Sequence, residues 1–522
     1  MRNLKRALSL ALASVMLLGM MVVGSSAKGI DDFTDKAEIV NQDAVAVTSA
    51  IGLFDGYEDG SFGPKNVVTR AEMAVIICTM LYGAGVNVNQ FAETNVFTDV
   101  PAWAQGYVNL CSSLGIVAGV GDGKFDPNAT VTTAQAVLML CRALGYFQNA
   151  ADFGDNWMLA ATAKGTALGL YGDLKLAANE GLTRDNVAEL VFNALTKAVP
   201  VQYNELLGVY YNENQGIIYS LEFNYLQTLG YKNFDLVYKT NENTDYGRPG
   251  TTWGIGSYRM DGNPSGEGNK EGVLNEDGSL IPERVKMTSD DEIITVADTP
   301  DFTYTANTKE NVIYKAVGKS VVDDYTWNVY VDGAEQAGDD LAPANDKDTD
   351  YAYTAKGATT EIYVDDVNDT VTVVMINYYM AEVTKVKDGE NTVRVLSNAT
   401  MTNPIDERTI IADGFAKGDY VVVTVDVNDD DDSFVASIAD PATAEGSVTY
   451  VAKASEPEDE DKGSYVKLDD GNKYTYSKYT ASDLDDINEE HPTLDISYRL
   501  YLAPNGYVIG FKALEGYYDN YL

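Results

Sequence analysis

The spacing of apolar residues divides the chain into two regions. Up to about residue 200, apolar residues recur every three or four positions, as at Trp103, Tyr107 and Leu110, and this spacing places one apolar face on a helix. From Ile293 onward, short apolar runs alternate with polar residues or are continuously β-branched. The clearest runs are Thr370–Ile376, Tyr420–Val425 and Tyr465–Leu468. The pattern predicts a helical N-terminal region followed by β-rich domains.

The helical region contains the same ordered signals three times between Phe33 and Pro200. Each copy opens with an aromatic-x-Asp triplet: Phe33-Thr34-Asp35, Phe97-Thr98-Asp99 and Phe153-Gly154-Asp155. In the first two copies a glycine-rich turn follows and ends on Phe62 or Phe125. Glycine adopts the positive φ that such turns require, and the phenylalanine is expected to hold the turn against the core. A triplicated helical unit is therefore predicted.

Each copy also contains a second helix start. The three starts are Thr69-Arg70-Ala71-Glu72, Thr132-Thr133-Ala134-Gln135 and Thr183-Arg184-Asp185-Asn186. The first two match a capping box, in which the threonine is the N-cap and Glu72 or Gln135 accepts a hydrogen bond from its backbone N–H. The third start has Asn186 at that position, and we expect it to be capped less well.

Taken together, the triplets, the glycine-rich turns and the Thr-Arg-Ala-Glu helix start resemble S-layer homology domains. The three copies would span residues 30–85, 95–147 and 151–199. The resemblance implies a helix-dominated, pseudo-threefold bundle. Its grooves would bind a secondary cell-wall polysaccharide, often one that carries acidic pyruvate ketals.

Two arginines are the candidate ligands for such an acidic sugar. Arg70 and Arg184 each stand at the first position of a helix, where unpaired N–H groups and the helix dipole favour an anion. A guanidinium adds a fork of donors that matches a carboxylate. Thr69 and Thr183 are the matching caps and candidate hydroxyl donors.

Two further positions bear on the sugar site. Thr133 stands where arginine is expected in the second copy, so this copy is predicted to hold a degenerate or neutral-sugar site. Trp103 is a candidate for stacking on a sugar ring. The alternative for Trp103 is a place in the core, because its spacing fits an apolar helix face.

The first 27 residues predict export. Met1–Ala27 combines basic residues, an apolar run from Ala7 to Val23 and a small-residue end, which is typical of a secretory signal peptide. The alternative is an uncleaved membrane anchor. No later segment reaches the roughly 18 apolar residues that a membrane-spanning helix needs, so we expect no transmembrane segment in the mature chain.

Charge and residue types exclude several functions. The formal net charge of −42 opposes binding to nucleic acid. A single histidine, His491, leaves no basis for a catalytic triad or a histidine zinc site. No GxSxG, HExxH or P-loop motif occurs, so we expect no enzyme, no cofactor and no metal site. The alternative to a metal-free chain is calcium bound by the clustered oxygens of Asn428–Asp432 or Asp365–Asp369. Neither segment has the residue spacing of an EF-hand.

The three cysteines, Cys78, Cys111 and Cys141, all lie in apolar, helix-like stretches. Their odd number argues against a disulfide framework. We expect buried free thiols, because cysteine often behaves as a small apolar residue. A bridge between Cys111 and Cys141 is the alternative in an oxidising compartment.

After the helical copies we predict a mixed connector at 200–290, with irregular loops at 240–290, then β-rich domains at 291–440 and a small β domain at 441–522. Turn dipeptides separate the expected strands: Asp332-Gly333, Asp388-Gly389, Asp413-Gly414, Asp470-Gly471 and Asn505-Gly506. Such dipeptides favour tight hairpins. Antiparallel sandwiches or small barrels are the expected architecture.

These observations predict a secreted protein of the cell wall or surface layer. Its helical copies would anchor it non-covalently to wall polysaccharide, and its β domains would serve surface display or self-association into a lattice. The alternative is a wall-anchored carbohydrate-active enzyme or an adhesin with the activity in the β region, since paired carboxylates leave no local signature in so acidic a chain.

Overall fold

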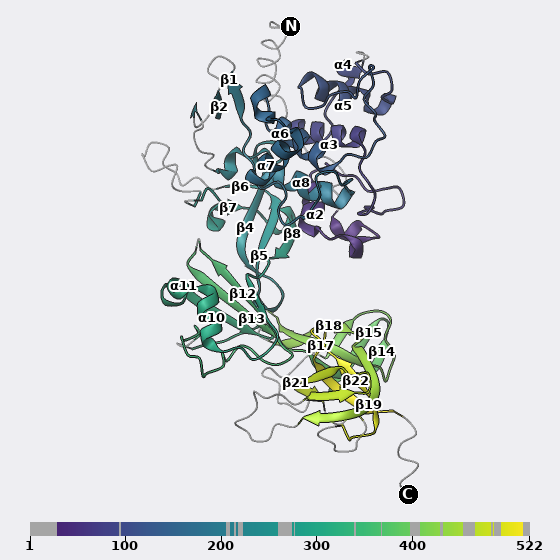
Figure 1. Ribbon diagram of the computed structural model, residues 1–522, viewed down its shortest axis with the longest axis vertical. Coiled ribbons are helices and arrows are strands. Elements are labelled where there is room, and N and C mark those ends of the chain that lie inside the picture. Colours follow the sequence, from purple (N-terminus) through teal and green to yellow (C-terminus); the bar gives the residue numbers. More distant parts are fainter. Residues whose placement is uncertain are drawn as a thin grey trace. The chain divides into compact units, whose positions relative to one another are not determined.

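The computed structural model describes residues 29–92, 96–204, 209–212, 216–217, 223–258, 274–275, 277–338, 341–366, 368–396, 408–428, 432–452, 465–481, 484 and 492–514. The predicted signal peptide lies outside these residues, as does most of the acidic run 428–432. The chain forms two compact units (Figure 1). The first unit contains residues up to 242 together with 251–296, and the second contains 243–250 together with residues from 297 onward.

The first unit contains the predicted helices. They are α2 (Gln42–Ala50), α3 (Arg70–Tyr82), α4 (Asn89–Ala92), α5 (Ala102–Ser113), α6 (Thr133–Ala143), α7 (Trp157–Ala167) and α8 (Arg184–Thr196). The long helices pair between sequence copies: α3 packs on α5, α6 on α7, and α8 on α2. The second helix of each copy therefore buries its apolar face against the first helix of another copy, and all of them share one core.

The backbone joins the copies in the same order. Each second helix donates its first N–H to a carbonyl of another copy: Arg70 to Ala129 at 2.9 Å, Thr133 to Glu180 at 2.9 Å and Arg184 to Asn66 at 2.8 Å. The predicted role of the turn phenylalanines is confirmed, since Phe62 and Phe125 are completely buried. No copy is complete by itself, because its helix start is held by a neighbour.

The region from 200 to 290, predicted as a mixed connector with irregular loops at 240–290, contains regular elements among its described residues. It contains β1 (Gln202–Asn204), β2 (Val209–Asn212), β3 (Gly216–Ile217), α9 (Leu229–Phe234), β4 (Leu236–Asn243), β5 (Pro249–Ile255), β6 (Ser257–Tyr258) and β7 (Val285–Lys286). Strands β4 and β5 form a sheet with β8 (Glu292–Ala297). Leu229 and Leu236 join the helical core, and the Trp253 ring meets Phe192 edge-on with centroids 4.9 Å apart. A few apolar side chains, widely spaced in the sequence, thus pack this segment against the helices.

The second unit is β-rich, as predicted. Its first sheet has the order β11-β10-β13-β12-β9, with bounds β9 (Phe302–Tyr304), β10 (Thr326–Val331), β11 (Ala334–Glu335), β12 (Thr359–Asp365) and β13 (Thr370–Ile376). Helices α10 (Glu310–Val317) and α11 (Lys319–Asp324) precede β10, and Ile313 of α10 is buried in the same core as Val329. The all-β prediction missed both helices because they are only eight and six residues long.

Two further β assemblies complete the second unit. One is a sheet of order β16-β15-β14-β17-β18 and the other is a closed barrel of order β19-β20-β21-β23-β22. The strands are β14 (Tyr379–Lys387), β15 (Glu390–Val395), β16 (Thr409–Ile411), β17 (Tyr420–Val427), β18 (Ser433–Ala439), β19 (Ala442–Ala452), β20 (Tyr465–Leu468), β21 (Lys473–Ala481), β22 (Ser497–Leu502) and β23 (Val508–Ala513). The predicted terminal hairpin is confirmed, with Gly506 at a φ of +84° between β22 and β23.

Candidate functional site

Arg70 joins the first copy to the turn of the second. Its Nε donates to the Phe125 carbonyl oxygen at 3.1 Å, and its Nη2 donates to the Ala118 carbonyl oxygen at 2.9 Å. The guanidinium carbon lies 4.5 Å from the centroid of the Phe125 ring. Burial lowers the pKa of Arg70, and the charges of Asp126 and Asp99 act in the opposite direction. Part of the guanidinium is therefore committed to holding the bundle together.

Arg184 makes the equivalent contacts from the third copy to the first. Its Nε donates to Phe62 O at 2.9 Å and its Nη2 to Asp55 O at 2.8 Å. Three rings surround the guanidinium, those of Phe54, Tyr57 and Phe62, with centroids 4.9 to 5.3 Å from its carbon. Arg184 is thus held in an aromatic cage made by another copy.

The helix starts do not offer the unpaired backbone N–H groups that we predicted for an anion. At α3, the N–H of Arg70 donates to Ala129 O and that of Ala71 donates to Pro127 O at 3.1 Å. The N–H of Glu72 donates to Thr69 Oγ1 at 3.3 Å. The first two of these N–H groups are hydrogen-bonded because another copy lies directly against the start of the helix. The periodicity of the sequence does not reveal this contact.

The N-cap residues of α3, α6 and α8 are Thr69, Thr132 and Thr183. Glu72 Oε2 accepts from the Thr69 N–H at 2.7 Å, and Gln135 Oε1 accepts from the Thr132 N–H at 3.2 Å. Thr183 Oγ1 accepts from the N–H three positions on at 3.3 Å. The Thr69 hydroxyl also donates to Glu72 at 2.8 Å, which leaves it occupied within the cap.

Thr133 replaces arginine by a shorter link to the neighbouring copy. It is completely buried, and its hydroxyl donates to the Glu180 carbonyl oxygen at 3.2 Å. Since the side chain has no exposed surface, a sugar cannot reach it in this structure. The second copy therefore keeps the contact between copies and lacks the cation.

The aspartates of the first two aromatic-x-Asp triplets fix the turns that the arginines bind. Asp99 accepts from the N–H groups of Phe125 and Asp126 at 2.8 and 2.9 Å. Asp35 accepts from Phe62 and Gly63 at 2.7 and 2.8 Å. Desolvation raises the pKa of Asp99, but the backbone hydrogen bonds outweigh it, so the pKa is lowered overall. Sequence reasoning used these aspartates only as repeat markers, although their constant place beside each turn was the available signal.

A groove of about 140 Å³ opens beside Arg70. Arg70, Gln135, Arg142 and Trp157 line it, and its apolar wall comprises Ile116, Val117, Ala118, Leu138 and Met139. The Arg142 guanidinium carbon lies 5.2 Å from the Phe153 ring centroid, and burial lowers the pKa of Arg142. Two arginines, a glutamine and a partly exposed tryptophan thus line one groove, to which all three copies contribute residues.

The groove contains only part of the predicted site. Arg70 lies in it, whereas Arg184, Thr183 and Trp103 are not among its lining residues. Trp103 is 57% exposed near the start of α5 and Trp157 is 39% exposed at the start of α7. We missed Trp157 and Arg142. The available signal was a tryptophan in the first turn of the first helix in the second and third copies.

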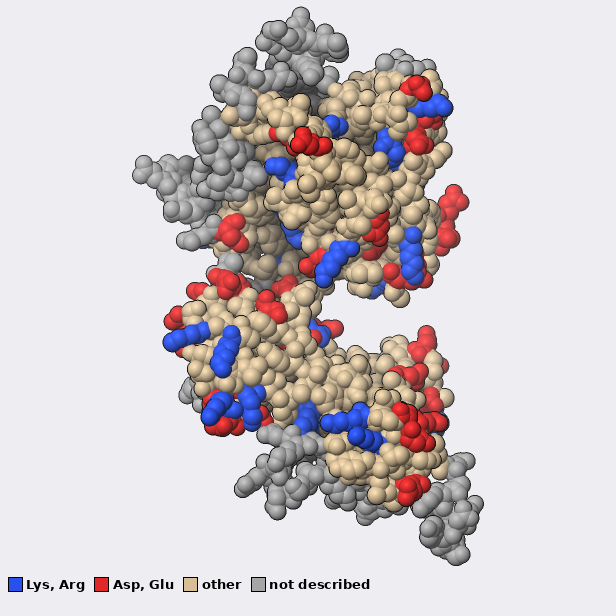
Figure 2. All heavy atoms as spheres, in the orientation of Figure 1, with Lys and Arg blue, Asp and Glu red and all other residues tan. Residues whose placement is uncertain are grey.

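Charged side chains elsewhere pair locally. Figure 2 shows lysines and arginines scattered among acidic residues on the face it draws. At Asp365–Asp369, the Asn368 amide donates to Asp365 at 2.7 Å and the Tyr325 hydroxyl donates to Asp366 at 2.9 Å. Among the residues that the structure describes, no group of three His, Cys, Asp or Glu side chains is arranged to hold a metal ion.

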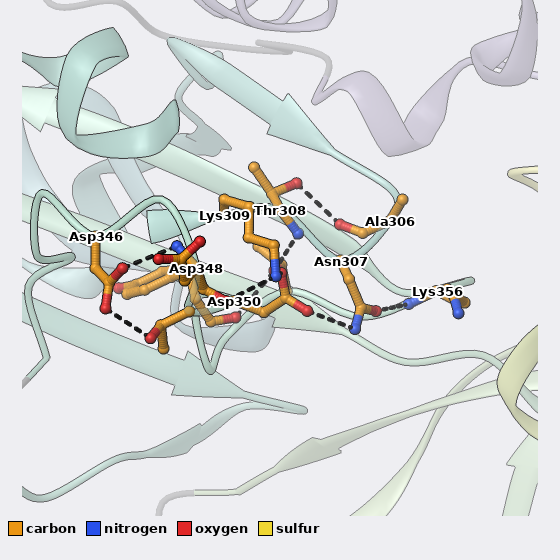
Figure 3. A network of polar contacts seen from close by, with 11 residues as sticks. Ala306, Asn307, Thr308, Lys309, Asp346, Asp348, Asp350 and Lys356 are labelled. Atoms are coloured by element: carbon orange, nitrogen blue, oxygen red, sulfur yellow. Dashed lines mark hydrogen bonds and ion pairs between the residues drawn. The ribbon is translucent and has the colours of Figure 1, made fainter. Parts of the chain in front are cut away.

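An acidic loop before β12 forms an ion pair and local hydrogen bonds. Lys309 Nζ lies 2.9 Å from Asp350 Oδ1 and donates to the Asp348 carbonyl oxygen at 3.0 Å (Figure 3). Asp346 accepts from the Asp348 N–H and the Thr349 hydroxyl, both at 2.8 Å. Lys309 thus offsets part of the negative charge of this loop.

Comparison with known proteins identifies the helical region. The S-layer homology domain family matches residues 32–74 and 96–137, which are the first two copies. None of the helices built from described residues has the length and apolarity to cross a membrane. The chain therefore carries S-layer homology domains, the class of module that its repeated helices and turns define.

Several relatives with similar sequences are named as surface, cell-wall or anchoring proteins. The chain is 35% identical over 198 residues to a cell surface protein of Thermoanaerobacter kivui, covering 37% of this chain and 25% of the relative. It is 31% identical over 196 residues to the middle cell wall protein of Brevibacillus brevis, covering 37% and 18%. It is 30% identical over 102 residues to a cellulosome-anchoring protein of Acetivibrio thermocellus, covering 19% and 23%. The chain thus spans a quarter or less of these relatives, and the likeness indicates a location at the cell wall or cell surface.

Proposed function

We propose that this protein is held non-covalently to an acidic secondary cell-wall polysaccharide through the groove formed by Arg70, Arg142 and Trp157. The observation that carries the proposal is that two arginines and a tryptophan line one groove. A guanidinium binds a carboxylate through two parallel hydrogen bonds, and an indole provides an apolar face for a sugar ring. A sugar bearing a pyruvate ketal has both features, and Gln135 adds a polar partner for its hydroxyl groups.

The third copy, at 151–199, belongs in this proposal as a third S-layer homology unit arranged in a pseudo-threefold bundle. Its support is the repeated contact pattern, in which α8 packs on α2 as α3 packs on α5. The groove also needs this copy, because Trp157 is its residue. A fragment that ended before α7 would lack one wall of the site.

We propose that the helical unit anchors the chain at the wall and that the second unit is thereby held at the cell surface. Its role would be surface display, adhesion or self-association into a layer. Support comes from its construction, because it consists of one mixed sheet, a second sheet and a closed barrel. Stable β domains of this kind suit a chain that has to remain folded outside the cell.

An enzymatic role has weaker support. An open groove of about 680 Å³ in the first unit is lined by Asp235, Lys286 and Asp291 among other residues. Hydrogen bonds from the Thr288 hydroxyl and N–H lower the pKa of Asp291. A glycoside hydrolase needs a general acid with a raised pKa, and Asp291 does not fit that role. We propose a non-enzymatic anchor.

Binding to purified cell-wall sacculi tests the proposal. The chain from residue 28 onward should bind native sacculi and lose binding to sacculi stripped of their polysaccharide. Arg142→Ala should weaken binding at least tenfold, since each charge-assisted hydrogen bond contributes about 1.5–3 kcal/mol. The matched control is Arg394→Ala on β15 of the second unit, whose side chain is 62% exposed. Equal binding to native and stripped sacculi would contradict the proposal.

A further inference from the structure

Two of the three cysteines face each other between helices of different copies. Cys78 on α3 and Cys111 on α5 have their sulfur atoms 3.5 Å apart, and both residues are completely buried. The predicted alternative partner of Cys111, Cys141, lies on α6. The expected buried thiols are confirmed, but the neighbouring pair is Cys78 and Cys111, because α3 and α5 pack against each other.

The pair is held symmetrically by the two helices. The Cys78 thiol donates to the Tyr107 carbonyl oxygen of α5 and the Cys111 thiol donates to the Ala74 carbonyl oxygen of α3, both at 3.6 Å. Each contact lies one helical turn before the opposite cysteine. Both side chains therefore point across the place where the two helices touch. A disulfide has sulfurs about 2.05 Å apart, so the pair must close by roughly 1.5 Å, a shift within the reach of small side-chain rotations.

We propose that Cys78 and Cys111 form a dithiol site that is oxidised to a disulfide linking the first copy to the second. The oxidant is a disulfide, represented by oxidised glutathione. This inference goes beyond wall anchoring and does not depend on it. Cys141 remains a free thiol.

The reaction is two successive thiol–disulfide exchanges. The thiolate of one cysteine attacks a sulfur of the oxidant, whose S–S bond breaks and releases one thiolate. The thiolate of the second cysteine then attacks the mixed disulfide at the first cysteine's sulfur and releases the second thiolate. Two cysteine thiols are oxidised, one small disulfide is reduced to two thiols, and the two cysteine protons pass to the leaving thiolates.

Burial determines when this exchange occurs. Hydrogen bonding to Cys78 and desolvation raise the pKa of Cys111, so Cys111 is held in the folded protein as the thiol, the less reactive form. No surface of either cysteine is open to an oxidant. Exchange therefore takes place while α3 and α5 are still coming together during folding, and the closed disulfide is afterwards protected from reduction by the same burial.

The bridge would stabilise the first unit. The two cysteines are 33 residues apart, and closing a loop of this length removes conformational freedom from the unfolded chain. The Tm of the oxidised first unit should exceed that of the reduced protein by on the order of 10 °C.

The test is to unfold the chain from residue 28 onward, refold it in a mixture of oxidised and reduced glutathione, and map its peptides without reduction. The expected result is a linked peptide pair containing Cys78 and Cys111, with Cys141 alkylated as a free thiol. Reduction with dithiothreitol should lower the calorimetric Tm of the first unit. Cys141→Ala should retain the bridge, and Cys111→Ala should abolish the Tm difference.

The outcome does not depend on the variants folding, since mapping of the wild-type chain decides the pairing. A predominant link from Cys111 to Cys141 or from Cys78 to Cys141 would overturn the proposal. Three alkylated thiols after refolding in the oxidising mixture would overturn it as well. A linked pair with an unchanged Tm would refute the stabilising role.

Discussion

The guanidinium carbon of Arg184 lies 4.9 Å from the ring centroid of Phe62, and the Nε of the same arginine donates to the Phe62 carbonyl oxygen at 2.9 Å. The phenylalanine belongs to the first copy and the arginine to the third, 122 residues later. Arg184, which the sequence predicts to bind ligand, therefore also links the third copy to the first. A substitution at this position is expected to change the stability of the first unit as well as any binding.

Arg184→Ala should destabilise the first unit by about 3 kcal/mol. The substitution removes two charge-assisted hydrogen bonds to carbonyl oxygens and the contacts with three rings. Calorimetric melting of the chain should show a lower Tm for the first unit and an unchanged Tm for the second. Arg394→Ala, on an exposed strand position of the second unit, should leave the first transition where it is. A wild-type Tm for Arg184→Ala would show that the cage contributes no stability.

Trp157→Ala should weaken binding to sacculi about tenfold, and Trp103→Ala should change it less than twofold. Both indoles are partly exposed near helix starts, but only Trp157 lines the groove with Arg70 and Arg142. Stacking of an aromatic ring contributes about 0.5–1.5 kcal/mol beyond the area it covers, and the loss of that apolar area adds to the effect. Sedimentation of labelled chain with sacculi measures both variants. If Trp103→Ala has the larger effect, the site lies at a different junction of the copies.

Two glycines after helix ends form a matched pair. Gly115 and Gly145 each follow a leucine at the end of a helix and have φ values of +73° and +94°. A Cβ at Gly115 would meet nothing within 4 Å, whereas a Cβ at Gly145 would lie 1.8 Å from the Val201 carbonyl oxygen. Gly115→Ala should cost about 1 kcal/mol, for the strained φ alone. Gly145→Ala adds an overlap with backbone and should cost several kcal/mol more.

Chemical denaturation of the two glycine variants measures the difference in the first unit. The comparison isolates the contact with Val201, because the backbone conformation is shared. Equal destabilisation would mean that the chain at Val201 moves away freely. In that case, packing of the following segment on the helical core would be weaker than the structure indicates.

The second unit should become less stable as the pH rises from about 4 to about 6. Asp332 is 1% exposed, and desolvation raises its pKa to about 6, although the Tyr379 hydroxyl and Asn377 donate to it. The folded carboxyl therefore keeps its proton where the unfolded chain, with a pKa of 3.8, has lost it. A folded pKa above the unfolded value adds stability at low pH that is lost as the pH rises through the folded pKa. The loss amounts to about 3 kcal/mol.

Asp332→Asn should remove most of this pH dependence. The amide does not titrate, and the remaining slope would come from Asp426, whose pKa burial also raises. Calorimetric Tm values of the second unit at pH 4, 5, 6 and 7 give the slope for both proteins. An unchanged slope in Asp332→Asn would assign the titration to another group.

Local chemistry in the sequence accounts for much of the helical region. The threonine-led helix starts, the turn phenylalanines and the short β-branched runs all appear as predicted, since each depends on neighbours within a few residues. The two helices before β10 were missed because they are only eight and six residues long. Contacts with distant elements were not predictable either, such as the packing of Ile313 with Val329 and of Leu236 with the helical core.

The sequence by itself determined the class of module, the presence of a cation at two of three helix starts and the β-rich character of the rest. The tertiary structure decided what those cations do. Because helices pair between copies, the turn of one copy lies against the helix start of another. The backbone N–H groups at the helix start and part of each arginine side chain therefore donate hydrogen bonds to carbonyl oxygens of the other copy. The same pairing brings Trp157 and Arg142 to Arg70 and sets Cys78 beside Cys111. These neighbours are remote in sequence, so only burial of the apolar helix faces against one another could select them.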